Sequence, residues 1–218
     1  MIDLDPYHRK ELAIVRDKSD PRRHVPPFDC TGLKVLDIGC GSGQTLTADE
    51  LVVARERHGI DVDGDAVARG KAAFPELALS VAAAEAVPYP DRNFDLVISR
   101  VALPYANLPV AFAEAYRVLK PGGRLWITLH PWSMERKRLA DAALGLRLRG
   151  LLSRAPVVAN SLVQHVAGRP LPLPEFVTRE TFQTPRGLRL MLQRAGFEGI
   201  EIAQRPTLMV IAVRPGAC

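Results

Sequence analysis

The residues best suited to bind a ligand occur in the segment VLDIGCGSG, which ends at Gly43. An apolar run leads directly into three alternate glycines, Gly39, Gly41 and Gly43, and a predicted helix follows. Glycines at such a point let the backbone turn sharply and let a ligand approach the main chain. A dinucleotide fingerprint, GxGxxG, would place its third glycine at position 44, where the chain has Gln44. This spacing, with Asp37 inside the end of the strand, disfavours NAD and FAD.

Short apolar runs alternate with helical stretches after the N-terminal segment, and this alternation predicts a parallel sheet covered on both faces. The expected strands are Lys34–Ile38, His58–Val62, Leu77–Ala82, Phe94–Ser99 and Arg124–Leu129. The expected helices between them are Thr45–Ala54, Asp65–Phe74 and Leu108–Leu119.

The C-terminal part predicts one more helix and a hairpin. Pro185–Ala195 has proline at its start and is ended by Gly196, as helices commonly are. Gly199–Gln204 and Thr207–Val213 then form two strands with a short connection, which favours an antiparallel hairpin. The chain is therefore expected to fold as α/β, with a seven-stranded, mostly parallel sheet whose last strand is antiparallel.

Two further segments complete a single domain over residues 1–218. Residues 1–32 are expected to form an N-terminal helical segment with a short helix at Tyr7–Lys18. Residues 131–180 interrupt the strand–helix alternation with five prolines around helical candidates at Leu139–Leu152 and Val157–Val166. We expect this insertion to form a helical lid over the acceptor site.

Composition narrows the functional class. The chain has no apolar run of membrane-spanning length and no basic-then-apolar N-terminus, so neither a membrane span nor a signal peptide is expected. Its three cysteines have no CxxC spacing, which argues against a disulfide framework and a structural zinc site and favours the cytoplasm. The net charge of +5 arises in residues 131–218, with 13 basic against 6 acidic residues. A solvated surface explains this excess more readily than nucleic-acid binding.

The glycine segment and three later motifs together resemble the class I S-adenosylmethionine-dependent methyltransferases, particularly the bacterial small-molecule enzymes. The resemblance is close over Leu33–Leu129 and looser over Phe182–Phe197. The later motifs are Gly59–Asp63 at the end of the second strand, Pro88–Val97 before the fourth strand, and Arg117–Gly123 before the fifth. The resemblance implies S-adenosylmethionine as cofactor and S-adenosylhomocysteine as product.

The resemblance to these methyltransferases also implies roles for individual residues. Asp61, at the carboxyl end of its strand, would accept hydrogen bonds from both ribose hydroxyls. Asp63 would either contact adenine or cap the next helix. Asp37 would orient the glycine loop and stabilise the cationic methionine end, and Val62 and Val87 would enclose the adenine. The expected cofactor-binding residues are Asp37, Gly39, Cys40, Gly41, Gly43, Asp61, Val62, Ala84, Glu85 and Ser99, with Arg100 beside Ser99 at the methionine carboxylate.

One position departs from the family pattern. The family usually has an aspartate near Ala83 that accepts a hydrogen bond from the adenine amino group. This chain has alanines there, so Glu85 or backbone carbonyls would take that part.

Methyl transfer needs alignment and desolvation more than covalent chemistry from the protein. A general base is required only for a hydroxyl or protonated amine acceptor, and His130 is the first candidate. The alternative interpretation is that His130 is a partly exposed residue that closes a strand. Tyr7, His8 and Tyr105 are candidates for the pocket wall, with Tyr105 also a catalytic candidate. Trp132, Phe176 and Phe182 are candidates for an apolar acceptor pocket.

Several alternatives remain for the acceptor. The Asp/Asn-Pro-Pro-Tyr/Phe motif of DNA-base amino-methyltransferases and a Pro-Cys nucleophile are absent from the sequence, and no metal-ligand spacing is present. We expect a small-molecule acceptor, with Arg179 pairing to a carboxylate or phosphate if the acceptor is anionic. An RNA or protein substrate, or a non-catalytic module that binds S-adenosylmethionine, is the alternative. The sequence leaves open whether the chain forms a homodimer.

Overall fold

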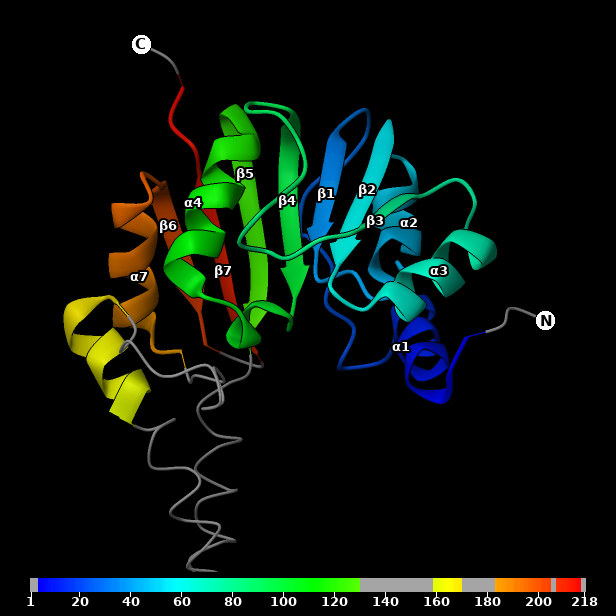
Figure 1. Ribbon diagram of the computed structural model, residues 1–218, viewed down its shortest axis with the longest axis horizontal. Coiled ribbons are helices and arrows are strands. Elements are labelled where there is room, and N and C mark those ends of the chain that lie inside the picture. The colour runs from blue at the N-terminus through cyan, green and yellow to red at the C-terminus, as the bar shows by residue number, and fades with distance from the viewer. Residues whose placement is uncertain (1–3, 130–158, 170–182, 205–206, 217–218) are drawn as a thin grey trace, which may run out of the picture.

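The computed structural model describes residues 4–129, 159–169, 183–204 and 207–216. The sheet has seven strands in the order β3-β2-β1-β4-β5-β7-β6 (Figure 1). Neighbouring strands pair in parallel from β3 to β5, and β7 is antiparallel to both β5 and β6. The predicted α/β class and the antiparallel last strand are confirmed. The strands are β1 (Lys34–Ile38), β2 (Glu56–Asp61), β3 (Ala78–Val81), β4 (Phe94–Arg100), β5 (Leu119–Leu129), β6 (Glu198–Ala203) and β7 (Leu208–Val213).

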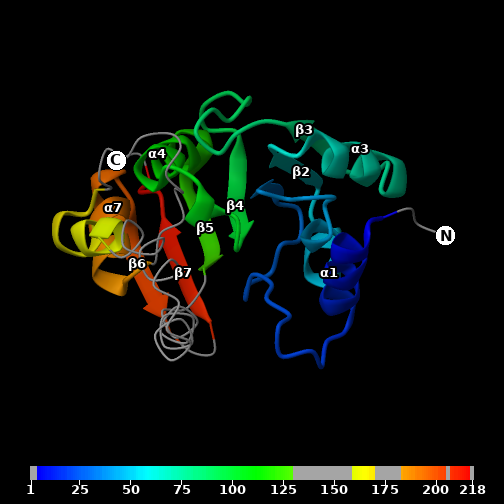
Figure 2. The same ribbon diagram turned by 60° about the horizontal axis from the view of Figure 1, so that its bottom comes forward.

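Helices pack on both faces of the sheet (Figure 2). The sheet separates the buried apolar residues into two clusters. On one face, here called the α4 face, α4 (Leu108–Val118) and α7 (Pro185–Arg194) bury Phe112 and Leu188. On the other, the α1 face, α1 (Pro6–Arg16) buries Leu12 together with residues of α2 (Asp49–Val52) and α3 (Gly64–Ala73). Alternate residues of each central strand therefore serve opposite faces.

Two local features near the site follow directly from the sequence: the burial of β1 and the start of α3. In β1, four of five residues are buried, as in a strand covered on both faces. The side chain of Asp63 accepts hydrogen bonds from the backbone N–H groups of Asp65 and Ala66, at 3.0 Å each. Asp63 is therefore the N-cap of α3, one of its two predicted roles.

Two predicted elements differ in the structure. The single helix predicted over Thr45–Ala54 is instead a 3-10 helix, η1 (Thr45–Thr47), followed by the one-turn α2. Ala48 separates them in an extended conformation with ψ of 145°. Strand β5 begins at Leu119 rather than Arg124, and its pairing with β4 shifts register between these two points.

The predicted insertion at residues 131–180 lies largely outside the described residues. Its described part contains a helix at residues 159–167, close to the predicted Val157–Val166. This helix packs beside α7: Arg194 donates a hydrogen bond to the carbonyl of Gly168 at 2.8 Å, and His165 Nδ1 lies 2.9 Å from Thr184 Oγ1. Its role as a lid stays a prediction.

Candidate cofactor and acceptor site

A hollow of about 690 Å³ opens at the carboxyl ends of β1, β2 and β4. This is the edge at which open α/β sheets bind ligands, and the volume lies in the range of small-molecule sites. Its walls come from the glycine loop, the segments after β2, β3 and β4, and α1. The predicted residues that line it are Gly39, Cys40, Gly41, Asp61, Val62, Ala84, Glu85, Arg100, Tyr105, Tyr7 and His8. Of the predicted cofactor residues, Asp37, Gly43 and Ser99 are not among its lining residues.

The glycine loop is constrained by the protein as well as by any ligand. Gly39 and Gly41 have φ of 78° and 55°, the left-handed region that favours glycine. A side chain at Gly39 would overlap Ala102, which follows β4. A Cβ atom at Gly41 would lie 2.9 Å from Nε2 of His8. The bare backbone therefore lets Ala102 and His8 approach the loop at the margin of the hollow.

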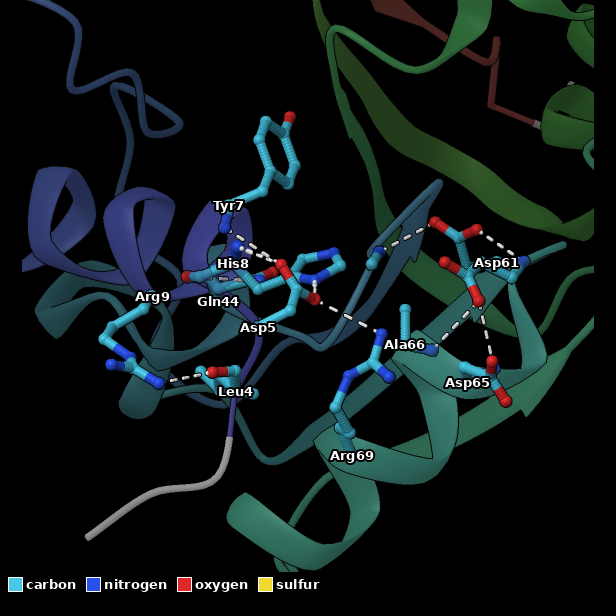
Figure 3. Close-up of polar contacts among 12 residues, drawn as sticks. Leu4, Asp5, Tyr7, His8, Arg9, Gln44, Asp61, Asp65, Ala66 and Arg69 are labelled. Carbon is cyan, nitrogen blue, oxygen red and sulfur yellow. Dashed lines mark hydrogen bonds and ion pairs between the residues drawn. The ribbon is translucent and has the colours of Figure 1, made fainter.

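Asp61 holds the glycine loop in place. Its Oδ2 accepts a hydrogen bond from the backbone N–H of Gly41 at 2.7 Å, and its Oδ1 accepts one from Asp63 at 2.9 Å (Figure 3). Each carboxylate oxygen keeps accepting capacity, and Asp61 lines the hollow. Asp61 is thus a preoriented acceptor for ligand hydroxyl groups.

Asp37 behaves differently from its predicted loop-orienting role. Its side chain is buried, and neither carboxylate oxygen has a hydrogen-bond partner among the described residues. Burial raises its pKa to about 7; Arg100 opposes this shift and Asp61 adds to it. An uncompensated buried carboxyl group beneath a glycine loop is a suitable counter-charge for a cationic ligand.

The side of the hollow beyond Asp61 is lined by Val62 and the alanines after β3. Val62 is exposed, whereas Val87 is buried in the cluster on the α4 face and is absent from the lining residues. The structure therefore does not bring these two valines together around a ligand. Glu85 lines the hollow, and its Oε1 accepts a hydrogen bond from the backbone N–H of Asn107 at 2.7 Å.

At the end of β4, Ser99 and Arg100 point to opposite faces. Ser99 is buried, and its hydroxyl has no partner among the described residues. Arg100 lines the hollow, donates a hydrogen bond from Nε to Thr45 Oγ1 at 3.1 Å, and forms an ion pair with Glu11 of α1 at 2.7 Å. The Arg100 and Glu11 side chains are only 14% and 18% exposed, so the positive charge is largely balanced within the protein.

Helix α1 contributes Tyr7, His8 and Glu11 to the wall of the hollow. Tyr7 and His8 were predicted to line the pocket, but the pairing of Glu11 with Arg100 was not. Glu11 lies four positions after Tyr7 and three after His8, so the three side chains share one face of the helix. This spacing indicates that Glu11 faces the same pocket. Asp5 begins that helix by accepting hydrogen bonds from the backbone N–H groups of Tyr7 and His8.

Of the two catalytic candidates, His130 and Tyr105, only Tyr105 lies within the described residues. His130 lies outside the described residues, so its role stays a prediction. Tyr105 ends the 3-10 helix η2 (Leu103–Tyr105) and lines the hollow with its side chain exposed. Tyr7 is the other exposed aromatic residue of the lining. Among the described residues, no group of three or more His, Cys, Asp or Glu side chains is arranged to hold a metal ion.

The strand that leads into this site ends in strain. Val101, immediately after β4, has φ of 63°, an unusual value for a β-branched residue. Its N–H donates a hydrogen bond to the carbonyl of Thr128 at 2.9 Å, and Val101 lines the hollow. Such outliers concentrate at functional sites, where the surrounding structure maintains them.

Sequence comparison relates the chain to known enzymes. Residues 36–127 match a family described as a methyltransferase domain. The chain is 32% identical over 170 residues to demethylmenaquinone methyltransferase of Thermus thermophilus, with 75% of this chain and 74% of that protein covered. It is 36% identical over 126 residues to a "Putative 23S rRNA (guanine-N(1)-)-methyltransferase" of Bacillus subtilis, with 56% of this chain but only 40% of that relative covered.

Solved structures share the fold at lower identity. An S-adenosylmethionine-dependent methyltransferase of Thermotoga maritima superposes with a TM-score of 0.59 at 15% identity, covering 95% of this chain and 89% of that one. One from Mesorhizobium loti gives a TM-score of 0.57 at 20% identity, covering 86% and 93%. Within the described ranges, every helix is too short or too polar to cross a membrane. The chain belongs to the class I S-adenosylmethionine-dependent methyltransferases, enzymes that use this cofactor as methyl donor.

Proposed function

We propose that the protein methylates a small molecule, which binds in the part of the hollow between Tyr7 and Tyr105. The observation that carries this proposal is the charge of the lining. Arg100 is the only arginine or lysine among the described lining residues, and it is paired with Glu11. A phosphate-rich acceptor would require unpaired basic side chains at this opening.

The residues of the hollow suit the cofactor in the following way. Asp61 would accept a hydrogen bond from a ribose hydroxyl, and Val62, Ala84 and Glu85 would border the adenine. The buried carboxyl group of Asp37 would balance positive charge near the glycine loop. When bound, S-adenosylmethionine supplies a methyl group activated by its sulfonium.

The remaining lining residues would position the acceptor and exclude water. Tyr7, Tyr105 and Leu103 offer an aromatic and aliphatic wall that suits a flat or partly apolar acceptor. If the acceptor is a hydroxyl, Tyr105 lies within the lining and His130 follows directly after β5, so either is a candidate to receive the proton. An anionic acceptor paired to Arg179 stays a hypothesis, since Arg179 lies outside the described residues.

Methylation of RNA is the second candidate. The name of the Bacillus subtilis relative and the basic excess of residues 131–218 favour it. The short coverage of that relative and the balanced charge of the described lining favour the small molecule.

The test follows a tritiated methyl group into separate product fractions. Purified protein, labelled S-adenosylmethionine and a cell extract are incubated, and the solvent-extractable fraction is separated from precipitated RNA and protein. We expect label in the extractable fraction, and much less with Asp61→Ala at a low concentration of S-adenosylmethionine, because cofactor binding should weaken by about 1.5–3 kcal/mol. A reduced demethylated quinone serves as one defined acceptor. Label in RNA that declines steeply with salt would instead establish the second candidate.

A further inference from the structure

We infer that His8 is a cofactor-binding residue, whose Nε2 accepts a hydrogen bond from a ribose hydroxyl beside Asp61, and that Asp5 orients its ring. This goes beyond the proposed acceptor class, because it concerns only the bound cofactor. The observations that carry it are the partners of the two ring nitrogens and the position of the ring over the glycine loop.

The first step is the fixed orientation of the ring. His8 Nδ1 is hydrogen-bonded to Asp5 Oδ2 (Figure 3). The same carboxylate accepts backbone N–H bonds from Tyr7 at 2.9 Å and His8 at 3.1 Å, and one from Arg69 Nη2 of α3 at 3.2 Å. Three donors besides the imidazole thus hold Asp5. The ring is anchored to a carboxylate that is itself anchored to two different helices.

The second step is the protonation of the ring nitrogens. The hydrogen bonds from His8, through its side chain and backbone, lower the pKa of Asp5 to about 2. Asp5 is therefore ionised at neutral pH and can only accept hydrogen bonds, so Nδ1 must be the donor. In a neutral imidazole this places the lone pair on Nε2. In its neutral form, His8 thus presents a hydrogen-bond acceptor on the side of its ring opposite Asp5.

The third step is the position of that acceptor. Nε2 lies 2.9 Å from where a Cβ atom of Gly41 would be, and the N–H of Gly41 is bonded to Asp61 Oδ2 at 2.7 Å. Figure 3 shows the ring beside Asp5, on the side toward Asp61. His8 is 9% exposed yet lines the hollow, so its small exposed surface faces the ligand space. Two acceptors, Asp61 and His8, therefore flank one glycine, an arrangement suited to two adjacent hydroxyl groups.

The ring's position favours a cofactor contact over a role as general base. Its Nε2 approaches the backbone of Gly41, whereas the neighbouring Tyr7, whose ring centroid lies 5.2 Å from that of His8, borders the proposed acceptor region. A base would need to reach the acceptor atom, and a ribose contact needs only to reach the cofactor.

Calorimetry with two ligands separates these roles. S-adenosylhomocysteine contains adenosine and the amino-acid end, and 5′-methylthioadenosine lacks the amino-acid end. We expect His8→Ala to weaken the binding of both ligands by about 5- to 30-fold, as loss of one hydrogen bond would. Asp5→Asn should weaken both by a smaller factor, since the ring remains but the carboxylate that orients it is replaced by an uncharged amide with one accepting oxygen. Of the 2′-deoxy and 3′-deoxy analogues, one should lose affinity for the wild-type protein and much less for His8→Ala, which identifies the hydroxyl that His8 contacts.

The controls make the inference falsifiable. Lys10→Ala, on the exposed side of the same helix, should leave both affinities unchanged. Circular dichroism establishes that each variant is folded, and His8→Gln supplies a side-chain acceptor if His8→Ala does not fold. Weakened binding of S-adenosylhomocysteine alone would place His8 at the amino-acid end and overturn the inference. Unchanged binding of both ligands would also overturn the inference, and a lower kcat with an altered pH profile would then favour a general base. The binding measurements, which decide the inference, require no knowledge of the methyl acceptor.

Discussion

The two faces of the sheet differ in how many apolar residues they bury and in whether they carry ligand-site groups. The cluster on the α4 face contains 23 buried apolar residues among those described, against 14 on the α1 face. At its carboxyl edge the α1 face carries polar groups: the unpartnered Asp37, the Arg100–Glu11 ion pair and the Asp5–His8 contact. We therefore expect apolar packing on the α4 face to contribute more to the free energy of folding. The α1 face buries fewer apolar residues and holds the polar groups that line or adjoin the ligand site.

The largest effect should come from the α4 face. Phe112 is fully buried there, and Phe112→Ala should lower the free energy of unfolding by about 3–5 kcal/mol, since it leaves a cavity. The affinity of the folded variant for S-adenosylhomocysteine should stay unchanged. Leu12→Ala, on the α1 face behind His8, should lower both quantities. Urea unfolding and calorimetry measure the two, and equal losses of affinity in both variants would remove the distinction between the faces.

A smaller effect concerns the pH dependence of Asp37. Its pKa is raised to about 7 in the folded state, so the folded protein holds this proton more tightly than the unfolded chain does. Both states are protonated well below the ordinary pKa of 3.8. As the pH rises from 4 to 7, the unfolded chain ionises first and stability falls, by on the order of 2–4 kcal/mol in total. Asp37→Asn should lack this fall.

The measurement is the difference in unfolding free energy between Asp37→Asn and wild type, taken from pH 4 to pH 8. It should change in favour of the variant as the pH rises, and contributions from other groups cancel in the difference. A difference that stays flat would show that Asp37 is paired or hydrated in the folded protein.

The ion pair between Glu11 and Arg100 should contribute less. Glu11→Gln leaves the arginine without its counter-charge while keeping the shape of the side chain, and we expect a loss of about 1–2 kcal/mol, between the values for exposed and fully buried pairs. Thermal unfolding at low and high salt measures this.

The matched control is the pair of Lys18 and Asp49, which also joins the N-terminal segment to the rest of the domain. Both of its side chains are largely exposed, so Lys18→Ala should leave the unfolding midpoint unchanged. Equal losses in the two variants would mean that burial does not determine how this segment is held.

Much of the fold was predictable because the strands have simple patterns. Lys34–Ile38 coincides with β1, since an apolar run bounded by a glycine turn specifies a buried parallel strand. The break at Ala48 was harder to see, because the apolar spacing of Thr45–Ala54 continues through it. Asp49 and Glu50 in the first turn of α2 were the sign of a new helix start.

The site was predictable where chemistry depends on neighbours in sequence. Asp61 and the loop glycines belong to one strand–turn unit and its parallel neighbour, so their meeting at one edge follows from the topology. The Arg100–Glu11 pair and the Asp5–Arg69 contact join segments distant in sequence. Local patterns do not encode such pairs; they follow from how α1 packs on the finished sheet.

Because β7 lies between β5 and β6 in the sheet but follows both in the chain, these two strands are synthesised before the strand that pairs with them. β6 precedes β7 along the chain, yet β7 is its only neighbour in the described sheet. Ribosomes add about 5–20 residues per second from the N-terminus, so β6 and the open edge of β5 emerge before the strand that joins them. Until residues 208–213 are available, both strands expose unpaired backbone groups that can pair with other chains. Aggregation of nascent or C-terminally truncated chains is therefore a hazard built into this topology.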